Sequence, residues 1–425
     1  MKIKLYYYLI KKKISKYLIK IFIRFKSDII ISLILLFNLR KMKKIKTSNN
    51  KKKVIVLSKS GGIEDLNIAY LHNNNNNNVT FYELSRGLIK EIFKYYIKDG
   101  KYKDYYTIDY SNEIKSRKDH YKEFIYKVLR NLNFFWKFDA CISFNLFYYA
   151  ENDLPEPFQR LKKKFIVIHK ESVNSPEESD INLQTYSEMN KRFYADKVAV
   201  YSENEKQLLI ESNILNEDQI EITGCARSDY SYSLRSIPPA QNVMVYFMVE
   251  NIWSHEMDDK LIVDWSQLVQ KINSYIKELA LENPNLKIIY KGKKNAHTIN
   301  DFPKNLPNNC TFDNSHSGEI YLKDANIVMA LNSTMVFEAI LANRNVIIPF
   351  FGVDKNKVIN FISKNPPSLF SSEKEDFFNK INRYLKTKYT QKSMTEEEKE
   401  SVKFYLGNID GKSGQRLREL ISSII

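Results

Sequence analysis

The stretch from Ile327 to Pro349 constrains the fold of this chain most, because its pattern predicts two apolar strands joined by one short helix. Residues 327–331 are an uninterrupted apolar run, which is typical of a strand covered on both faces. The polar turn Asn332-Ser333-Thr334 follows, and such side chains favour the start of a helix. A helix that begins at the carboxyl end of a parallel strand predicts a site for an anion, commonly a phosphate.

Glu338 lies one helical turn after Thr334, on the same face of the expected helix. A carboxylate in this position is suited to accept hydrogen bonds from a ribose diol, so we expect a nucleotide-binding role. The alternative is that Ser333 and Thr334 merely cap the helix and that Glu338 is solvated.

The net charge of +16 is located in the first eighth of the chain. Residues 1–53 contain 17 Lys or Arg and one acid, Asp28, so the remaining residues carry no net charge. This distribution argues against a groove for nucleic acid, and we expect no such partner. The three cysteines form no Cys-x-x-Cys pair and the histidines no His-Glu-x-x-His motif, so the sequence predicts no metal site.

Residues 1–50 alternate lysines with large apolar residues. The longest run without a charge, residues 29–39, has 11 residues, whereas a helix needs about 20 to span a bilayer. We therefore expect basic amphipathic helices that bind an anionic membrane surface, and a cytoplasmic protein peripheral to the inner face of the cytoplasmic membrane. The alternative is a solvated basic extension.

Short apolar runs alternate with helical patterns along the rest of the chain, which predicts parallel, doubly wound sheets. The expected domains are residues 51–236, residues 241–394 after a linker that contains Pro238-Pro239, and a helical tail at 395–425. The expected strands are residues 53–58, 105–110, 138–144, 165–169, 198–201, 220–223, 243–249, 286–291, 327–331 and 346–350. The expected helices are residues 81–97, 120–132, 265–281 and 333–342.

Polar residues follow three of the expected strands. His169, Lys170 and Glu171 end one strand, where together they are suited to bind phosphate and to act as a general base. A surface cluster whose charges satisfy one another is the alternative. Near the domain boundary, Gly224 suits a sharp turn and Arg227 is a candidate to bind phosphate, unless Arg227 pairs with Asp229.

The third group lies in a lysine-rich loop after the strand at 286–291. Lys291, Lys293 and His297 in this loop are suited to neutralise a diphosphate leaving group. A solvated run of lysines is the alternative. The chain has no Asp-x-Asp triplet, no P-loop and no Gly-x-Gly-x-x-Gly fingerprint.

Two of these segments resemble those of a known family. The Gly-x-x-Arg-x-Asp segment at residues 224–229 and the Ser-Thr-x-x-x-Glu-Ala segment at residues 333–339 are similar to those of bacterial surface-carbohydrate (capsule and lipopolysaccharide) biosynthesis proteins. The resemblance implies the GT-B glycosyltransferase architecture, in which two Rossmann-like domains face a central cleft. It also implies sugar transfer from a nucleotide-activated sugar to a saccharide or lipid-linked acceptor, without a metal or other cofactor.

The resemblance implies roles for the groups above. The second domain would hold the nucleotide through Asn332, Ser333, Thr334 and Glu338, and residues 169–171 would face the acceptor or the sugar. Glu171 is the expected base, with Glu64 or Asp65 as alternatives. The resemblance extends to the CDP-glycerol glycerophosphotransferases, which usually have Asp where Glu338 stands and a His-Pro pair that His297 lacks. A polyol-phosphate transferase and an inactive scaffold are therefore the alternative functions.

Overall fold

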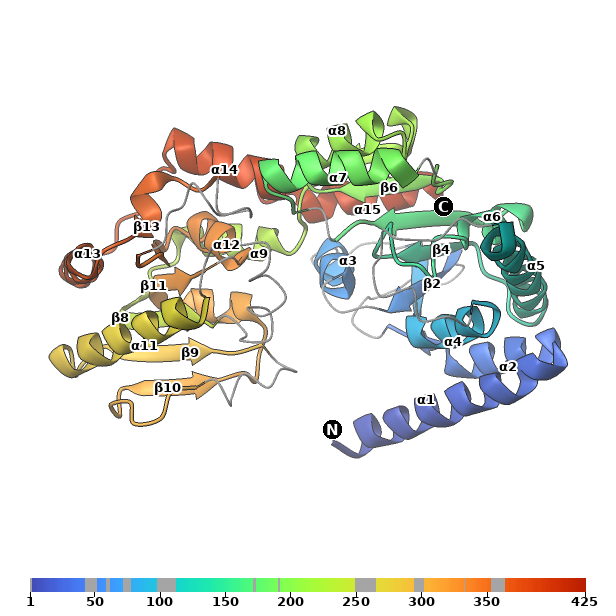
Figure 1. Cartoon of the computed structure of the whole chain (residues 1–425), viewed down its shortest axis with the longest axis horizontal. Coiled ribbons are helices and arrows are strands. Elements are labelled where there is room, and N and C mark those ends of the chain that lie inside the picture. The colour runs from blue at the N-terminus through green and yellow to red at the C-terminus, as the bar shows by residue number, and fades with distance from the viewer. Residues whose placement is uncertain are drawn as a thin grey trace. The chain divides into compact units, whose positions relative to one another are not determined.

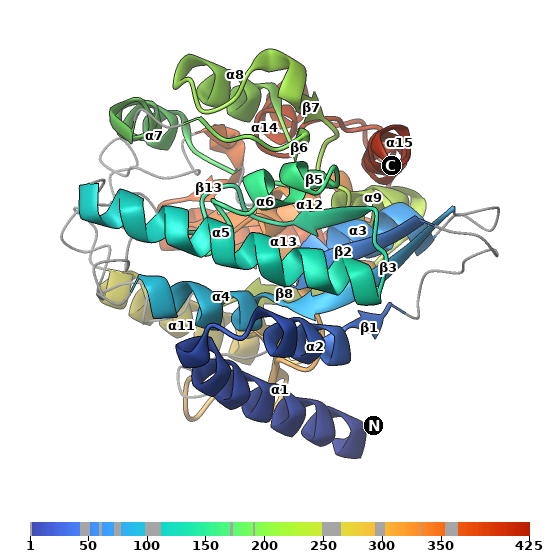
Figure 2. The same cartoon turned by 90° about the vertical axis from the view of Figure 1, so that its right-hand side faces the viewer.

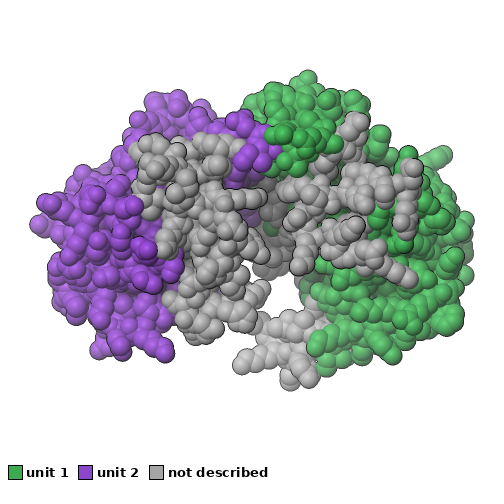
Figure 3. Space-filling view, in the orientation of Figure 1, with its two compact units in different colours: residues 1–172, 182–226, 413–425 green, residues 173–181, 227–412 purple. Residues whose placement is uncertain are grey.

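The chain divides into two compact units (Figure 3). Unit 1 comprises residues 1–172, 182–226 and 413–425, and unit 2 comprises residues 173–181 and 227–412. The structure, a computed structural model, describes residues 2–42, 52–58, 62–71, 78–97, 112–170, 173–189, 192–248, 265–293, 302–331, 333–352 and 364–425. Each unit is described by itself below.

Unit 1 contains a seven-stranded sheet in the order β1-β3-β2-β4-β5-β6-β7. Figure 1 shows β2, β4 and β6 of this sheet with helices on either side. All neighbouring strands are parallel except the short edge strand β1, which runs antiparallel to β3. The strands are β1 (Arg40–Lys41), β2 (Lys52–Ser58), β3 (Val79–Ser85), β4 (Ala140–Ser143), β5 (Lys164–Ile168), β6 (Lys197–Val200) and β7 (Ile220–Ile222).

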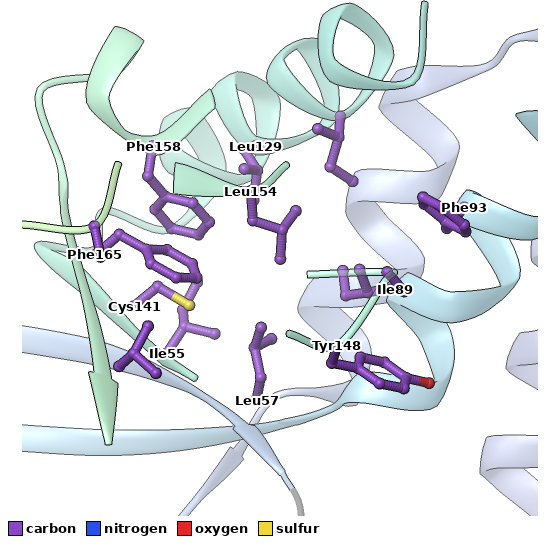
Figure 4. Close-up of a cluster of buried hydrophobic side chains, with 14 of the residues drawn as sticks. Ile55, Leu57, Ile89, Phe93, Leu129, Cys141, Tyr148, Leu154, Phe158 and Phe165 are labelled. Carbon is purple, nitrogen blue, oxygen red and sulfur yellow. The ribbon is translucent and has the colours of Figure 1, made fainter. Parts of the chain in front are cut away.

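Helices cover both faces of the unit 1 sheet, because its strands alternate apolar residues between the two faces. Val54 and Val56 of β2 join one apolar cluster, which includes residues of α3 and α15. Ile55 and Leu57 join the other cluster, with residues of α1, α2, α4 and α5 (Figure 4). The helices are α1 (Lys2–Phe22), α2 (Asp28–Asn38), α3 (Gly62–Leu71), α4 (Arg86–Tyr96), α5 (Asn112–Phe135), α6 (Pro155–Arg160), α8 (Glu203–Glu211) and α15 (Ser413–Ile424). Helix α7 (Pro176–Met189) is divided between the units, with its first residues up to Ile181 in unit 2.

Unit 2 contains a six-stranded parallel sheet in the order β10-β9-β8-β11-β12-β13. Relabelled in chain order this is 3-2-1-4-5-6, the strand order of the Rossmann fold. The strands are β8 (Ala240–Phe247), β9 (Lys287–Lys291), β10 (Cys310–Asp313), β11 (Ala325–Ala330), β12 (Asn345–Pro349) and β13 (Phe370–Ser371). The helices are α9 (Ser228–Ser233), α11 (Trp265–Glu282), the 3-10 helix η5 (Gly318–Lys323), α12 (Met335–Leu341), α13 (Lys374–Lys386) and α14 (Glu396–Leu406).

The prediction of two α/β units with doubly wound parallel sheets is confirmed. The prediction of a helix over residues 81–97 is wrong in its first part, because residues up to Ser85 belong to β3, which pairs with the whole of β2. Val79 to Tyr82 are β-branched or aromatic, and such residues favour a strand. The strand predicted at 105–110 lies outside the described residues.

The basic N-terminal segment forms α1 and α2, which lie side by side (Figure 2). The two helices and the short 3-10 helix η1 (Ile23–Phe25) between them form a hairpin, whose inner face contributes Ile19, Ile23, Ile31 and Leu35 to the apolar cluster of unit 1. Among the described residues, no helix has both the length and the apolar character needed to cross a membrane.

Candidate functional site

The strand order of unit 2 reverses between β8 and β11, which lie next to each other but are separated in the chain by β9 and β10. In sheets of this kind, ligands bind outside the carboxyl ends of the strands at the point of reversal. The pairing of β10, β9, β8 and β11 places their last residues in one row at the carboxyl edge of the sheet: Asp313, Lys291, Phe247 and Ala330. Neighbouring strands are about 4.8 Å apart, so Lys291 is about 10 Å from Ala330, where the chain leaves β11.

Helix α12 begins directly beyond the end of β11. Ser333 and Thr334 precede it and are half-buried, and Asn332 lies outside the described residues. The Ser333 hydroxyl accepts a hydrogen bond from the Met335 N–H at 3.3 Å, while the Thr334 side chain at the N-cap position makes no capping hydrogen bond. Two hydroxyls and the first amides of α12 therefore stand at the reversal point, as the sequence predicts.

Three elements meet at the start of α12. A Cβ atom added to Gly318, the first residue of η5, would lie 2.9 Å from the Met335 sulfur and 3.1 Å from a ring carbon of Phe247. Real Cβ atoms essentially never come within 3.0 Å of such atoms, so a side chain at Gly318 would displace its neighbours. The close approach at Gly318 fixes the loop after β10 against the end of β8 and the start of α12.

Lys291 contributes a buried positive charge to the carboxyl edge of the unit 2 sheet. It ends β9, is 5% exposed, and its ammonium donates a hydrogen bond to the Gly292 carbonyl. Its Nζ lies 5.4 Å from the ring centroid of Tyr321 in η5. Lys293, two residues later, is exposed, and His297 lies outside the described residues. A buried ammonium and two hydroxyls at the same edge of the sheet are suited to a doubly charged anion that spans them.

A further polar cluster at this edge was not predicted from the sequence. Asp313, at the end of β10, accepts hydrogen bonds from the Ser315 N–H at 2.8 Å and the Ser315 hydroxyl at 2.6 Å. His316 Nδ1 lies 2.7 Å from the same hydroxyl. Burial opposes the charge of Asp313, but these hydrogen bonds and the nearby Tyr321 hydroxyl lower its pKa to about 2. The Tyr321 oxygen itself has no hydrogen bond of good geometry. The sequence did not indicate this cluster, because β10 has only four residues and so short a strand has no recognisable hydrophobic pattern.

The helices at the two segments that carry the family resemblance, α9 and α12, pack together within unit 2. Glu338 is 5% exposed, and its carboxylate accepts a hydrogen bond from the Ser231 hydroxyl of α9 at 3.4 Å. Arg227 is the N-cap residue of α9 and is half-buried. The buried hydrogen bond therefore fixes α9, with Arg227 at its start, against α12. Gly224, just before this segment, has a φ of 79°, a left-handed conformation that favours glycine.

His169 lies at the carboxyl end of β5 in unit 1 and is 1% exposed. Its Nδ1 accepts a hydrogen bond from the Leu146 N–H at 3.3 Å, which places the ring proton of a neutral imidazole on Nε2. Nε2 lies 3.4 Å from the carboxylate of Glu205, which is also 1% exposed. His169 thus joins the loop after β4 to the first turn of α8. Lys170 is half-buried, and Glu171 lies outside the described residues.

The two alternative carboxylates for the base lie in the first turn of α3, after β2. Unit 1 reverses its strand order between β2 and β4, so α3 begins at the reversal point of that sheet. Asp65 is fully buried and accepts a hydrogen bond from the Tyr201 hydroxyl at 2.8 Å, whereas Glu64 is exposed. Glu64 is therefore the more accessible of these two carboxylates.

A polar cavity of about 520 Å³ lies at the opposite edge of the unit 2 sheet. Asn326 and Asn345, at the amino ends of β11 and β12, line it together with residues of the loop after α13. This cavity is separate from the carboxyl edge described above. Within the described ranges, no group of three or more His, Cys, Asp or Glu side chains is placed to hold a metal ion.

No family model and no curated protein matches this chain. Among solved structures, it is similar to the wall teichoic acid polymerase TagF over 98% of both chains, with 12% identity and a TM-score of 0.49. It is similar to S. aureus MnaA in a co-structure with UDP over 88% of this chain and 96% of that chain (12% identity, TM-score 0.45). It is similar to Anabaena HepE in complex with UDP and glucose over 88% of this chain and 99% of that chain, with 11% identity and a TM-score of 0.40.

Proposed function

We propose that this chain is a GT-B glycosyltransferase that binds a nucleotide-activated sugar on unit 2. One observation carries the proposal most: the strand order reverses where Lys291 and the hydroxyls of Ser333 and Thr334 stand at the same carboxyl edge. A nucleoside diphosphate placed there would receive hydrogen bonds from the hydroxyls of Ser333 and Thr334. Lys291 would neutralise the negative charge that develops on the departing diphosphate.

The remaining predicted residues act around this diphosphate. Lys293 and His297 follow Lys291 in the sequence, and Asn332 precedes the two hydroxyls, so we propose that these three residues also bind the diphosphate. Glu338 was expected to bind ribose. Its burial and its hydrogen bond to Ser231 instead favour a positioning role, in which it holds α9 and thereby Arg227 beside α12.

Unit 1 would bind the acceptor, and one of its carboxylates would deprotonate the acceptor hydroxyl. Glu171 is the base expected from the sequence, and Glu64 is the exposed carboxylate at the reversal point of the unit 1 sheet. His169 is enclosed between Leu146 and Glu205, so we propose that it positions Lys170 and Glu171 and does not itself touch substrate. The Glu64→Gln and Glu171→Gln variants separate the two bases, because the variant of the true base loses turnover while it retains nucleotide affinity.

The acceptor would be membrane-proximal or lipid-linked, as in surface polysaccharide assembly. The support is the excess of lysines in residues 1–53, which is suited to the anionic inner face of the cytoplasmic membrane. Binding to vesicles that contain anionic lipid, reduced by raised ionic strength, is the expected result.

The proposal is tested by nucleotide binding to the full chain, measured by calorimetry with UDP, CDP, GDP and CMP. Loss of a hydrogen bond to a charged phosphate costs about 1.5–3 kcal/mol, so Ser333→Ala/Thr334→Ala should weaken binding of the preferred nucleotide at least about 10-fold. Lys291→Met should weaken it by a similar factor. Matched controls at the opposite edge are Ser393→Ala and Lys388→Met, which should retain affinity. If the control variants weaken nucleotide binding as much as the variants of Ser333, Thr334 and Lys291 do, the proposed diphosphate site at the carboxyl edge is refuted.

The choice of nucleotide separates the proposal from the alternatives. A preference for CDP together with transfer from CDP-glycerol would replace sugar transfer with polyol-phosphate transfer. No binding of any of the four nucleotides would favour an inactive scaffold.

A further inference from the structure

The outer surface of α1 and α2 is the most apolar exposed region among the described residues of unit 1. Eight large apolar side chains on this hairpin have exposures of 36–76%: Ile10, Ile14, Tyr17, Phe25, Ile29, Ile30, Leu33 and Phe37. Contiguous apolar surface of this kind marks an interaction site on a soluble protein.

The hairpin is held firmly to unit 1, so its outer surface is a permanent feature. The Ser32 hydroxyl donates a hydrogen bond to the Val128 carbonyl of α5 at 2.7 Å. Lys16 and Lys20 of α1 pair with Glu91 of α4 at 3.5 and 3.7 Å. Together with the buried residues on the inner face of the hairpin, these contacts fix α1 and α2 to unit 1, and none of the described residues of unit 1 covers the outer face of the two helices (Figure 2).

A groove of about 350 Å³ runs between the two helices on this outer face. Its lining is apolar apart from Lys11 and Ser15, and it consists of Ile10, Lys11, Ile14, Ser15 and Leu18 from α1 with Ile30, Leu33, Ile34 and Phe37 from α2. The Lys11 ammonium donates to the Phe37 carbonyl at 2.7 Å and lies 3.8 Å from the centroid of the Phe37 ring. An ammonium group thus stands in the wall of a hydrocarbon-lined groove.

We propose that this groove binds the hydrocarbon chain of one anionic lipid, with the anionic headgroup beside Lys11. The positive charge of residues 1–53 favours an anionic lipid, because these residues contain 17 Lys or Arg and one acid. Exposed apolar residues outside the groove, Tyr17, Phe25 and Ile29, continue the same face, as expected of a helical surface that rests in the lipid headgroup region. An acidic peptide helix is the competing occupant.

The inference deepens the membrane docking of the proposed function, and its test does not involve nucleotide. The probe is a series of alkyl phosphates with 8 to 14 carbons, each kept below its micelle concentration and titrated into the full chain. Burial of a methylene contributes about 0.8 kcal/mol, so each added methylene should raise affinity up to about fourfold until the groove is filled, after which affinity levels off. Dodecyltrimethylammonium, a cation of the same chain length, should bind more weakly.

Two variants provide the decisive comparison. Leu33 lines the groove and is 45% exposed, whereas Ile29 does not line it and is 52% exposed. Leu33→Trp should fill the groove and weaken dodecyl phosphate binding at least tenfold, while Ile29→Trp should change it less than twofold. Both variants should still sediment with vesicles of anionic lipid, because both keep the apolar face.

Three results would overturn the groove assignment: no binding of dodecyl phosphate to the wild-type chain, equal loss in the two tryptophan variants, or binding of an acidic amphipathic peptide but not of the alkyl phosphates. Nucleotide binding is measured on the same wild-type sample. If the wild-type chain binds dodecyl phosphate but none of the four nucleotides, the proposed transferase is refuted and the groove assignment is retained.

Discussion

Removal of Arg86 tests how the carboxyl edge of the unit 1 sheet is held together. Arg86 Nε lies 2.7 Å from Glu151, and the two side chains are 13% and 2% exposed. The Ser143 hydroxyl donates to the other carboxylate oxygen of Glu151 at 2.5 Å, and the guanidinium lies 3.5 Å from the centroid of the Tyr148 ring. Arg86→Met keeps most of the apolar stem but leaves Glu151 as a buried charge without its cation.

Breaking a buried ion pair in this way costs about 3–5 kcal/mol. Nη2 of Arg86 is buried without a hydrogen bond, so the native arrangement is not fully satisfied and we expect the lower end, about 3 kcal/mol. For a unit of this size, 1 kcal/mol corresponds to about 2–4 °C, so the Tm of unit 1 should fall by about 6–12 °C. Circular dichroism during heating, together with urea unfolding, measures the change.

Two further variants control for the loss of charge. Arg40→Met breaks the exposed pair of Arg40 with Glu83 and should cost no more than about 1 kcal/mol. Arg86→Met/Glu151→Gln removes both charges and should be more stable than Arg86→Met alone. The reasoning is refuted if Arg86→Met and Arg40→Met lower the Tm equally, or if the double variant is the least stable of the three.

Two other predictions concern the strand ends. Gly62→Ala places a Cβ atom 2.2 Å from ring carbons of Phe144 and should lower the free energy of unfolding by about 1–3 kcal/mol. Gly318→Ala brings its Cβ atom 2.9 Å from the Met335 sulfur, which is on a flexible side chain, and should lower it less. Urea unfolding compares the two variants, and an equal loss of stability would contradict this packing. The lowered pKa of Asp313, about 2, means that its carboxylate stabilises unit 2 above about pH 4 and that this contribution is lost as the pH falls towards 2. Asp313→Asn should therefore lower stability at pH 5 more than at pH 3, and a difference independent of pH would show that the charge is not responsible.

The sequence predicts the parallel strands well, because strands covered on both faces appear as short continuous apolar runs. Residues 327–331 and 346–350 are such runs, and β11 and β12 occupy nearly the same positions. β3 was missed because its burial pattern does not alternate and because it leads directly into α4. Short strands such as β10 were missed because four residues carry too little pattern to separate them from a loop.

The candidate site was predictable only in part, because burial depends on packing that a local pattern does not contain. Ser333 and Thr334 lie at the end of a strand, as expected. His169 and Glu338 follow the predicted spacing too, but the structure places both in the interior, next to Glu205 and Ser231. These partners are 36 and 107 residues away in the chain, and no motif links them.

The location of a bound nucleoside diphosphate tests the central claim most directly. A crystal structure of the full chain with the nucleotide that calorimetry selects would show it. Our account predicts that the diphosphate lies within hydrogen-bond distance of the hydroxyls of Ser333 and Thr334 and beside the ammonium of Lys291. A nucleotide bound instead in the polar cavity at the amino ends of β11 and β12 would contradict the account.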